Sequence, residues 1–196
     1  MGKSGRFGIV AIACSTGGPQ ALHKVIPMLP EHLGVPVTVL QHMPAGFTKS
    51  LADRLNGMSK LTVKEAEDGE ILLPDYVYIA PGGCHFEVTA KAGKLYSHVY
   101  NGPPVNNLKP NADVMYESLI DVDVGSILCV VLTGMGSDGT KGIASLKESK
   151  DIYCITQNED TCVVYGMPRA VELSGLSNAS VPLDEIAKTI SNKIGG

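Results

Sequence analysis

The stretch Phe7-Gly-Ile-Val-Ala-Ile-Ala-Cys14, followed at once by Ser15-Thr-Gly-Gly-Pro19, decides the fold class of this 196-residue chain. The first segment is short and almost uniformly apolar, which is typical of a strand buried on both faces of a parallel sheet. The proline then favours a helix over residues 20–29 that ends before Pro30. A buried strand, a glycine-rich turn and a helix in this order predict the first half of a βαβ unit.

The same order recurs along the chain. A second buried strand is expected over 36–42 and a third, the most strongly apolar, over 126–133. Further elements are expected as helices over 47–58, 112–121, 141–148 and 183–194 and as a strand over 152–156. This alternation predicts an α/β fold that is a single doubly wound domain over residues 1–196, with a mostly parallel sheet and helices on both faces.

The middle of the chain has a different character. Short β-favouring segments separated by glycine-containing turns occupy residues 61–66, 76–80, 85–90 and 94–100. We expect these segments to form an antiparallel β-hairpin insertion over about residues 61–100, near one edge of the sheet.

Composition and charge exclude several classes of function. The net charge is −4 and no cluster of Lys and Arg marks a nucleic-acid-binding face, so no nucleic-acid partner is expected. The longest apolar runs are far too short to cross a bilayer, and the first six residues do not resemble a secretory signal, so we expect a cytoplasmic chain without membrane insertion. The five cysteines lack CxxC spacing, so a zinc site is not expected. We expect neither a metal site nor a cofactor.

Polar side chains follow three of the expected parallel strands. Ser15 comes directly after the first strand, His42 ends the second, and Asp138 lies in the glycine-rich turn after the strand over 126–133. Ligands of such sheets bind outside the carboxyl ends of the strands, near the point where strand order reverses. We therefore expect the three side chains to lie on one rim of the sheet.

These three residue types are the ones that nucleophilic catalysis needs. A serine hydroxyl is a weak nucleophile at neutral pH and requires an adjacent base, which His42 supplies. Asp138 would hold the imidazole in the correct tautomer and stabilise it when it is charged. Backbone N–H groups at the start of the helix after Ser15 would stabilise an oxyanion.

Each residue taken alone also has a structural interpretation. Ser15 can be a helix N-cap, His42 a hydrogen-bonded histidine at a strand end, and Asp138 a cap or the first residue of an Asx turn. His85 is a candidate for substrate contact or a solvated histidine of the hairpin. The coincidence of three such residues on one rim favours catalysis.

Four longer motifs resemble the catalytic domain of the chemotaxis protein-glutamate methylesterases (CheB-type). They are Ala11-Ile-Ala-Cys-Ser-Thr-Gly-Gly-Pro-Gln-Ala-Leu22, Gln41-His-Met-Pro-Ala-Gly-Phe-Thr48, Tyr78-Ile-Ala-Pro-Gly-Gly83 and Leu132-Thr-Gly-Met-Gly-Ser-Asp-Gly139. The late segment 157–169, with Tyr165-Gly-Met-Pro168, also matches. The resemblance covers nearly the whole chain in order.

The resemblance implies hydrolysis of glutamyl methyl esters on the cytoplasmic helices of methylated chemoreceptors, with release of methanol, and deamidation of glutamine at some of the same sites. It implies that Ser15 is the nucleophile, His42 the base and Asp138 the orienting acid. It also implies oxyanion donors at the backbone amides of Thr16 and Met135. The glycines expected to let the backbone approach the substrate closely are Gly17, Gly18, Gly134 and Gly136.

The sequence departs from the family pattern in three places. Relatives usually carry an N-terminal receiver domain, which we expect to be absent here, although it would be a partner in a longer protein. Cys14 stands beside the nucleophile where alanine is more usual, and its oxidation would affect the site. The segment 108–113 matches the family's Arg-Pro-Ser-x-Asp motif only in part.

Two alternative functions remain. A Rossmann-like nucleotide-binding module would hold a phosphate at the helix after Ser15, although neither GxGxxG nor GxxxxGK[ST] follows the first strand. A catalytically silent domain that docks to receptors would keep the fold without the activity.

Overall fold

Seven parallel strands form the central sheet of the computed structural model, which describes residues 6–196. The strand order is β3-β4-β2-β1-β7-β8-β9, and a separate antiparallel pair is formed by β5 and β6. The strands are β1 (Phe7–Cys14), β2 (Val37–Gln41), β3 (Thr62–Glu65), β4 (Tyr76–Ile79), β5 (His85–Lys91), β6 (Lys94–Tyr100), β7 (Ser126–Val131), β8 (Ile152–Gln157) and β9 (Ala179–Val181).

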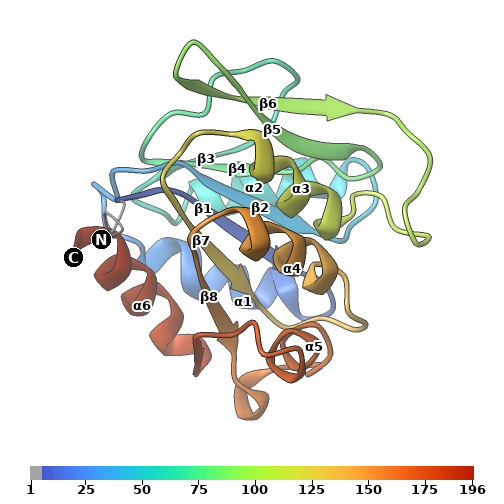
Figure 1. The fold of residues 1–196 in the computed structure, drawn as a ribbon, viewed down its shortest axis with the longest axis vertical. Coiled ribbons are helices and arrows are strands. Elements are labelled where there is room, and N and C mark those ends of the chain that lie inside the picture. Colours follow the sequence, from blue (N-terminus) through green and yellow to red (C-terminus); the bar gives the residue numbers. More distant parts are fainter. Residues whose placement is uncertain (1–5) are drawn as a thin grey trace.

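Helices cover both faces of this sheet (Figure 1). The α-helices are α1 (Gly18–Val25), α2 (Phe47–Asn56), α3 (Ala112–Ser118), α4 (Thr140–Ser149), α5 (Met167–Leu173) and α6 (Leu183–Gly195). Three short 3₁₀ segments are η1 (Ile26–Met28), η2 (Leu119–Asp121) and η3 (Glu159–Thr161). One apolar core packs α1, α2 and α6 against the sheet, and a second packs α3, α4, α5 and β5 against the opposite face.

The alternation of side chains along β1 explains why the two cores are separate. Val10, Ile12 and Cys14 belong to the first core, whereas Ala11 and Ala13 belong to the second. Successive side chains of a strand point to opposite faces, so a strand buried on both faces must be apolar throughout. The prediction of a doubly wound α/β fold with a buried parallel sheet is therefore confirmed.

The strand order reverses beside β1. After β1 the chain adds β2 on one side, and later returns to add β7 on the other side. The carboxyl ends of β1, β2 and β7 therefore meet at the switch point of the sheet, where ligands of such folds bind.

The expected hairpin over 61–100 needs a correction. Only its second half, β5 with β6, is antiparallel; β3 and β4 pair in parallel with each other, and β4 pairs with β2, so they extend the main sheet. The physical reason is burial, because Val77, Tyr78 and Ile79 are all buried and fill both faces of β4. A solvated hairpin would show one polar face instead.

Three other elements differ from the expectation. The helix expected over 20–29 begins earlier, at Gly18, and changes to the 3₁₀ segment η1 after Val25. Helix α5 and strand β9 were not predicted. Both are short, and a three-residue strand offers too little periodicity for recognition from sequence.

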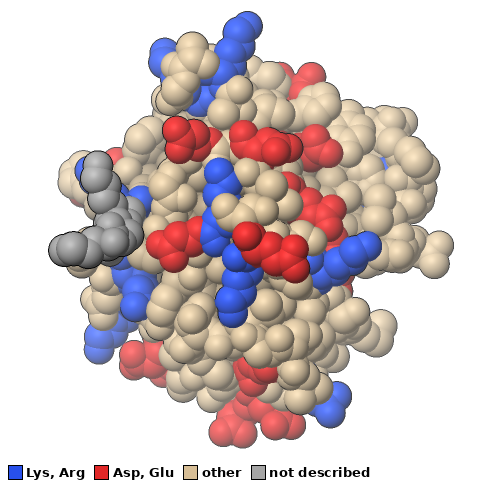
Figure 2. All heavy atoms as spheres, in the orientation of Figure 1, with Lys and Arg blue, Asp and Glu red and all other residues tan. Residues whose placement is uncertain are grey.

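The surface agrees with the mixed charge pattern of the sequence. Figure 2 shows acidic and basic side chains interspersed over the visible face, and few charges on the right, where the loop over 101–110 lies in Figure 1. No helix within residues 6–196 is both long and apolar enough to span a bilayer. Residues 1–5, which make up most of the N-terminal segment that does not resemble a secretory signal, lie outside the described residues.

Candidate active site

Ser15 is the first residue after β1 and is partly exposed. Its backbone N–H donates to the carbonyl of Thr133 at 3.0 Å, and its carbonyl accepts from Gly18 at 2.7 Å, which closes the turn into α1. No hydrogen bond from its hydroxyl to another described residue is found, so the hydroxyl is free to meet a ligand at the rim.

His42 lies beside Ser15. Cys14 and Gln41 are register partners of the parallel strands β1 and β2, and the next residues are Ser15 and His42. The His42 N–H donates to the Cys14 carbonyl at 3.2 Å, so the pairing continues past the strand end. Directly paired residues of neighbouring strands lie about 5 Å apart, which brings the two backbones together.

Side-chain alternation gives the direction of the two side chains. Cys14 and Gln41 point to the same face, since their side chains hydrogen-bond at 3.0 Å. Ser15 and His42 follow them by one residue each and therefore continue on the opposite face. That face is the one covered by α3 and α4.

Asp138 reaches the same place from the turn after β7. His42 Nε2 and Asp138 Oδ2 are 2.7 Å apart, and the two side chains are only 12% and 4% exposed. An ionised carboxylate accepts hydrogen bonds, so Nε2 carries the proton and Nδ1 is left as the basic nitrogen. No hydrogen bond from Nδ1 to a described residue is found.

Three hydrogen bonds fix the Asp138 carboxylate. In addition to His42, the backbone N–H groups of Ala112 and Asp113 donate to it, at 2.7 and 3.1 Å. Both amides belong to the first turn of α3, whose unpaired N–H groups favour an anion. The carboxylate is thus held by backbone and cannot rotate away from His42 without losing bonds.

The two expected oxyanion donors belong to residues next to this group: Thr16 follows Ser15, and Met135 follows Gly134, where a Cβ would lie 2.9 Å from Ser15 Cβ. In the described part of the chain, no hydrogen bond is found from the backbone N–H of Thr16 or of Met135. The carbonyl in the same peptide unit as each amide is hydrogen-bonded: Ser15 accepts from Gly18 and the Gln41 side chain at 2.7 and 2.9 Å, and Gly134 accepts from Gly166 and Met167 at 3.1 and 2.8 Å. These hydrogen bonds fix the two peptide units, while their N–H groups remain available to a ligand.

The four rim glycines differ in why a side chain would not fit at their positions. A Cβ on Gly134 would lie 2.9 Å from Ser15 Cβ, and a Cβ on Gly18 would collide with the Gln41 amide. At these two positions it is the protein itself that approaches the backbone closely. Gly17 and Gly136 adopt positive φ angles of 80° and 86°, and only Gly136 has open space around it.

Sequence reasoning missed two residues that hold the turn after β1. The buried Gln41 side chain donates to the carbonyls of Ser15 and His42, at 2.9 and 3.1 Å, and so ties the two strand ends together. Thr133 connects the same turn to the loop after β8 through Val164. The sequence signal that could have revealed Gln41 is a polar residue at the end of a buried strand, directly before His42.

Clefts flank the candidate site. One of about 900 Å³ is lined by Asp138, Gly136 and Leu108, and a smaller one of about 350 Å³ is lined by Gly17 and Val163. Ser15 and His42 line neither. Met135 and Val163 are 72% and 62% exposed, so the rim presents apolar side chains to a ligand.

Cys14 is adjacent to Ser15 in sequence but faces away from it. The thiol is fully buried in the core under α1 and α2, and burial raises its pKa far above the usual range. Cys129 and Cys154 are also buried, and burial raises the pKa of Cys154 to about 12. Because the thiolate is the reactive species, these three side chains are protected.

Native protein treated with iodoacetamide near neutral pH is therefore expected to remain unmodified at Cys14, Cys129 and Cys154. Peptide mass spectrometry of native and urea-unfolded samples checks this, because all three should be alkylated once the protein unfolds. Cys84, which is partly exposed, serves as the internal control. Rapid alkylation of Cys14 in the native protein would contradict the structure.

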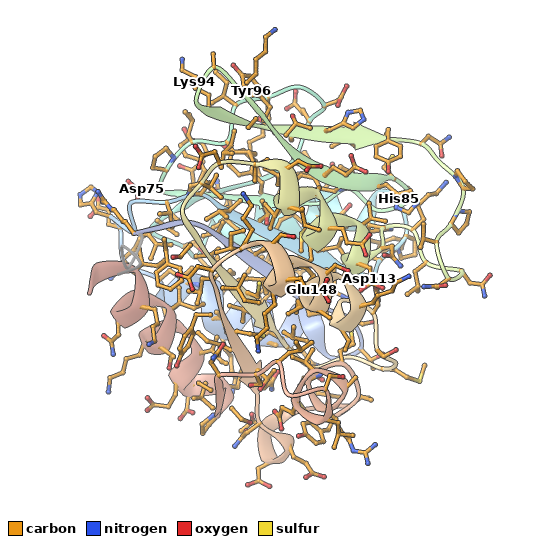
Figure 3. The ribbon with its side chains drawn as sticks, in the orientation of Figure 1. Asp75, His85, Lys94, Tyr96, Asp113 and Glu148 are labelled. Carbon is orange, nitrogen blue, oxygen red and sulfur yellow. The ribbon has the colours of Figure 1, made fainter. Side chains whose placement is uncertain are left out.

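His85 is neither a solvated hairpin histidine nor an exposed contact residue. It is 1% exposed, and its Nε2 lies 2.8 Å from the Pro103 carbonyl. Figure 3 shows His85 and Asp113 on one side of the molecule and Asp75 and Lys94 on the opposite side. Within residues 6–196, no group of three or more His, Cys, Asp or Glu side chains is arranged to hold a metal ion.

Comparison with known proteins gives the family. The family model for CheB methylesterase matches residues 10–190. The chain belongs to this family. It is 48% identical over 95% of its length to a protein-glutamate methylesterase/protein-glutamine glutaminase of Geobacillus kaustophilus, and 45% identical over 94% to one of Bacillus subtilis.

A solved structure is similar over the whole fold. The crystal structure of the Thermotoga maritima CheB methylesterase catalytic domain matches with a TM-score of 0.90 at 42% identity, and the match covers 97% of this chain and 99% of that one. The chain spans 54% and 52% of the two curated relatives, about half their length. The fold and family expected from the sequence are confirmed.

Proposed function

We propose that this chain hydrolyses glutamyl methyl esters on the cytoplasmic helices of chemoreceptors and releases methanol. The observation that carries the proposal is the 2.7 Å bond between His42 and Asp138, at a rim where strand register sets Ser15 beside His42. The names of the CheB methylesterase relatives supply the substrate class.

Acylation is the first step of the proposed reaction. The Ser15 hydroxyl attacks the ester carbonyl while His42 Nδ1 takes its proton. The carbonyl oxygen becomes an oxyanion, which the backbone N–H groups of Thr16 and Met135 stabilise. As the tetrahedral intermediate collapses, the C–O bond breaks and the methoxide leaves with the proton from His42, as methanol.

Deacylation repeats the same proton transfers with water. Water attacks the Ser15 ester and gives a proton to His42, which returns it to the serine oxygen as the glutamyl carboxylate leaves. Asp138 stabilises the imidazolium in both halves through its bond to Nε2. Side chains, backbone amides and water are the only groups that these reaction steps use.

Glutamine deamidation follows the same course with a different leaving group. An amide nitrogen leaves only after protonation, so His42 must deliver the Ser15 proton to it before the C–N bond breaks. The products are ammonia and a glutamate side chain. We include this activity in the proposal because the relatives carry both names.

The decisive assay is methanol release from a methylated chemoreceptor cytoplasmic fragment, with the unmethylated fragment as control. We expect stoichiometric methanol from the methylated fragment alone. Absence of release with a correctly methylated fragment and folded protein would reject the proposal.

The same samples separate the alternatives. A receptor-docking domain without activity would bind the fragment without methanol release. A nucleotide-binding module would show heat in calorimetry with nucleotides or dinucleotides, for which the proposed esterase has no need.

A further inference from the structure

Helices α3 and α4 begin side by side, and N–H groups at the start of each donate to a carboxylate that lies at the start of the other. Asp138, just before α4, accepts from the N–H groups of Ala112 and Asp113 at the start of α3. Asp113, in the first turn of α3, accepts from Gly139 and Gly142 at the start of α4, at 3.0 and 2.7 Å. Asp138 therefore caps α3, and Asp113 caps α4.

Helix α4 depends on this exchange. Its N-cap residue is Gly139, which has no side chain to accept from the first turn. The first N–H groups of a helix have no partner within the helix and need an acceptor from elsewhere. Asp113 Oδ1 meets two of them at once.

The two helix starts are also too close to shift independently. A Cβ on Gly142 would lie 2.7 Å from Asp113 Cα and 2.8 Å from the Asp113 carbonyl oxygen. The backbone of α4 thus rests directly on Asp113. Asp138 is the residue that immediately precedes Gly139, so whatever holds Gly139 also holds Asp138.

The Asp113 carboxyl group occupies an unfavourable place. It is 7% exposed, and burial, as the main cause, raises its pKa, with a further rise from the charge of Asp138. The hydrogen bonds from Gly142 and Gly139 lower the pKa in part. Burying a second carboxylate beside Asp138 costs free energy, and the two hydrogen bonds from the start of α4 offset part of that cost.

We propose that Asp113 is a positioning residue for the esterase reaction: by holding the first turn of α4, it fixes the Asp138 carboxylate against His42. The inference rests on the proposed function. Asp113 touches neither the ester nor His42 in this scheme. It acts only through Asp138.

The test compares three substitutions of Asp113 by methanol release. Asp113→Asn keeps an oxygen that can accept from Gly139 and Gly142, whereas Asp113→Ala removes it and Asp113→Glu displaces it while keeping the charge. Misplacement of a catalytic group by about 1 Å costs roughly 100-fold, so Asp113→Ala and Asp113→Glu are expected to lower kcat about 10- to 100-fold. KM should stay within about threefold, and Asp113→Asn should keep kcat within about fivefold of wild type, since the acceptor is retained.

A matched control is Ser118→Ala. Ser118 lies in the last turn of the same helix and accepts from Val88 N–H at 2.9 Å, so its loss perturbs α3 far from Asp138. Its kcat should be unchanged even if the unfolding temperature falls. If Asp113→Ala does not fold, the comparison of the Asn and Glu variants still decides the question.

Adding Asp113→Ala to an Asp138→Asn protein distinguishes a positioning role of Asp113 from a merely structural one. If Asp113 acts through Asp138, adding Asp113→Ala there should lower kcat by less than about threefold further. A multiplicative further loss, an unchanged kcat in both the Ala and Glu variants, or a rise in KM alone would overturn the inference. If wild-type protein releases no methanol, it is the proposed function that fails.

Discussion

Ser15→Ala is expected to lower the rate of methanol release by roughly 10⁴–10⁶-fold. The substitution removes the only proposed nucleophile, whereas the proposed oxyanion donors at Thr16 and Met135 remain. The fold should survive, because the Ser15 hydroxyl has no hydrogen-bond partner among the described residues and the backbone bonds to Thr133 and Gly18 do not involve it. Single-turnover methanol release with excess enzyme measures the effect.

Thr16→Ala is the matched control for this prediction. Thr16 carries the neighbouring hydroxyl and is exposed, but the proposal uses only its backbone N–H, which alanine retains. Its rate should stay within about threefold of wild type. Near-full turnover by Ser15→Ala would show that another group attacks the ester.

Asp138→Asn is expected to lower the rate of methanol release by about 10⁴-fold. The carboxylate accepts from three donors, which are His42 Nε2 and the backbone N–H groups of Ala112 and Asp113. An amide NH₂ group cannot accept a hydrogen bond, and in asparagine it replaces one of the two carboxylate oxygens. At least one of these donors therefore faces the NH₂ group and loses its acceptor. Either the imidazole loses its partner and its tautomer, or the start of α3 is disturbed.

Asp151→Asn provides the control for the loss of a carboxylate. Asp151 precedes β8 at the opposite end of the sheet from the rim and accepts from the Ser126 hydroxyl at 2.6 Å. Its rate should match that of wild type. An Asp138→Asn protein with more than about a tenth of wild-type activity would contradict the orienting role.

The fold class could be predicted because the decisive strands are buried on both faces. Burial on both sides leaves an uninterrupted apolar run, which β1 and β7 display and which a solvated strand cannot. The same rule applied to 76–79 would have placed β4 in the main sheet. The neighbouring turn signals, which suggest a hairpin, obscured it.

The rim was predictable for a topological reason. Parallel strands end at the same edge, so residues that follow them converge without any knowledge of side-chain geometry. The supporting residues were not predictable in this way. The part played by Asp113 depends on how closely α3 approaches α4 at Gly142, and no periodicity of either segment carries that information.

Gln41 illustrates the same limit. Its position at the end of β2 is evident from the sequence, and a buried polar side chain must find partners. Which partners it finds depends on the register between β1 and β2. Only the structure shows that they are the carbonyls on either side of the site.

The most direct measurement of the central claim is the double variant Ser15→Ala/His42→Ala, compared with each single variant by single-turnover methanol release. If hydroxyl and imidazole work as one unit, each single variant loses roughly 10⁴–10⁶-fold, and the double variant is no slower than the slower of the two by more than about threefold. Losses that instead multiply, or a His42→Ala protein that turns over like wild type, would show that the two groups do not act together.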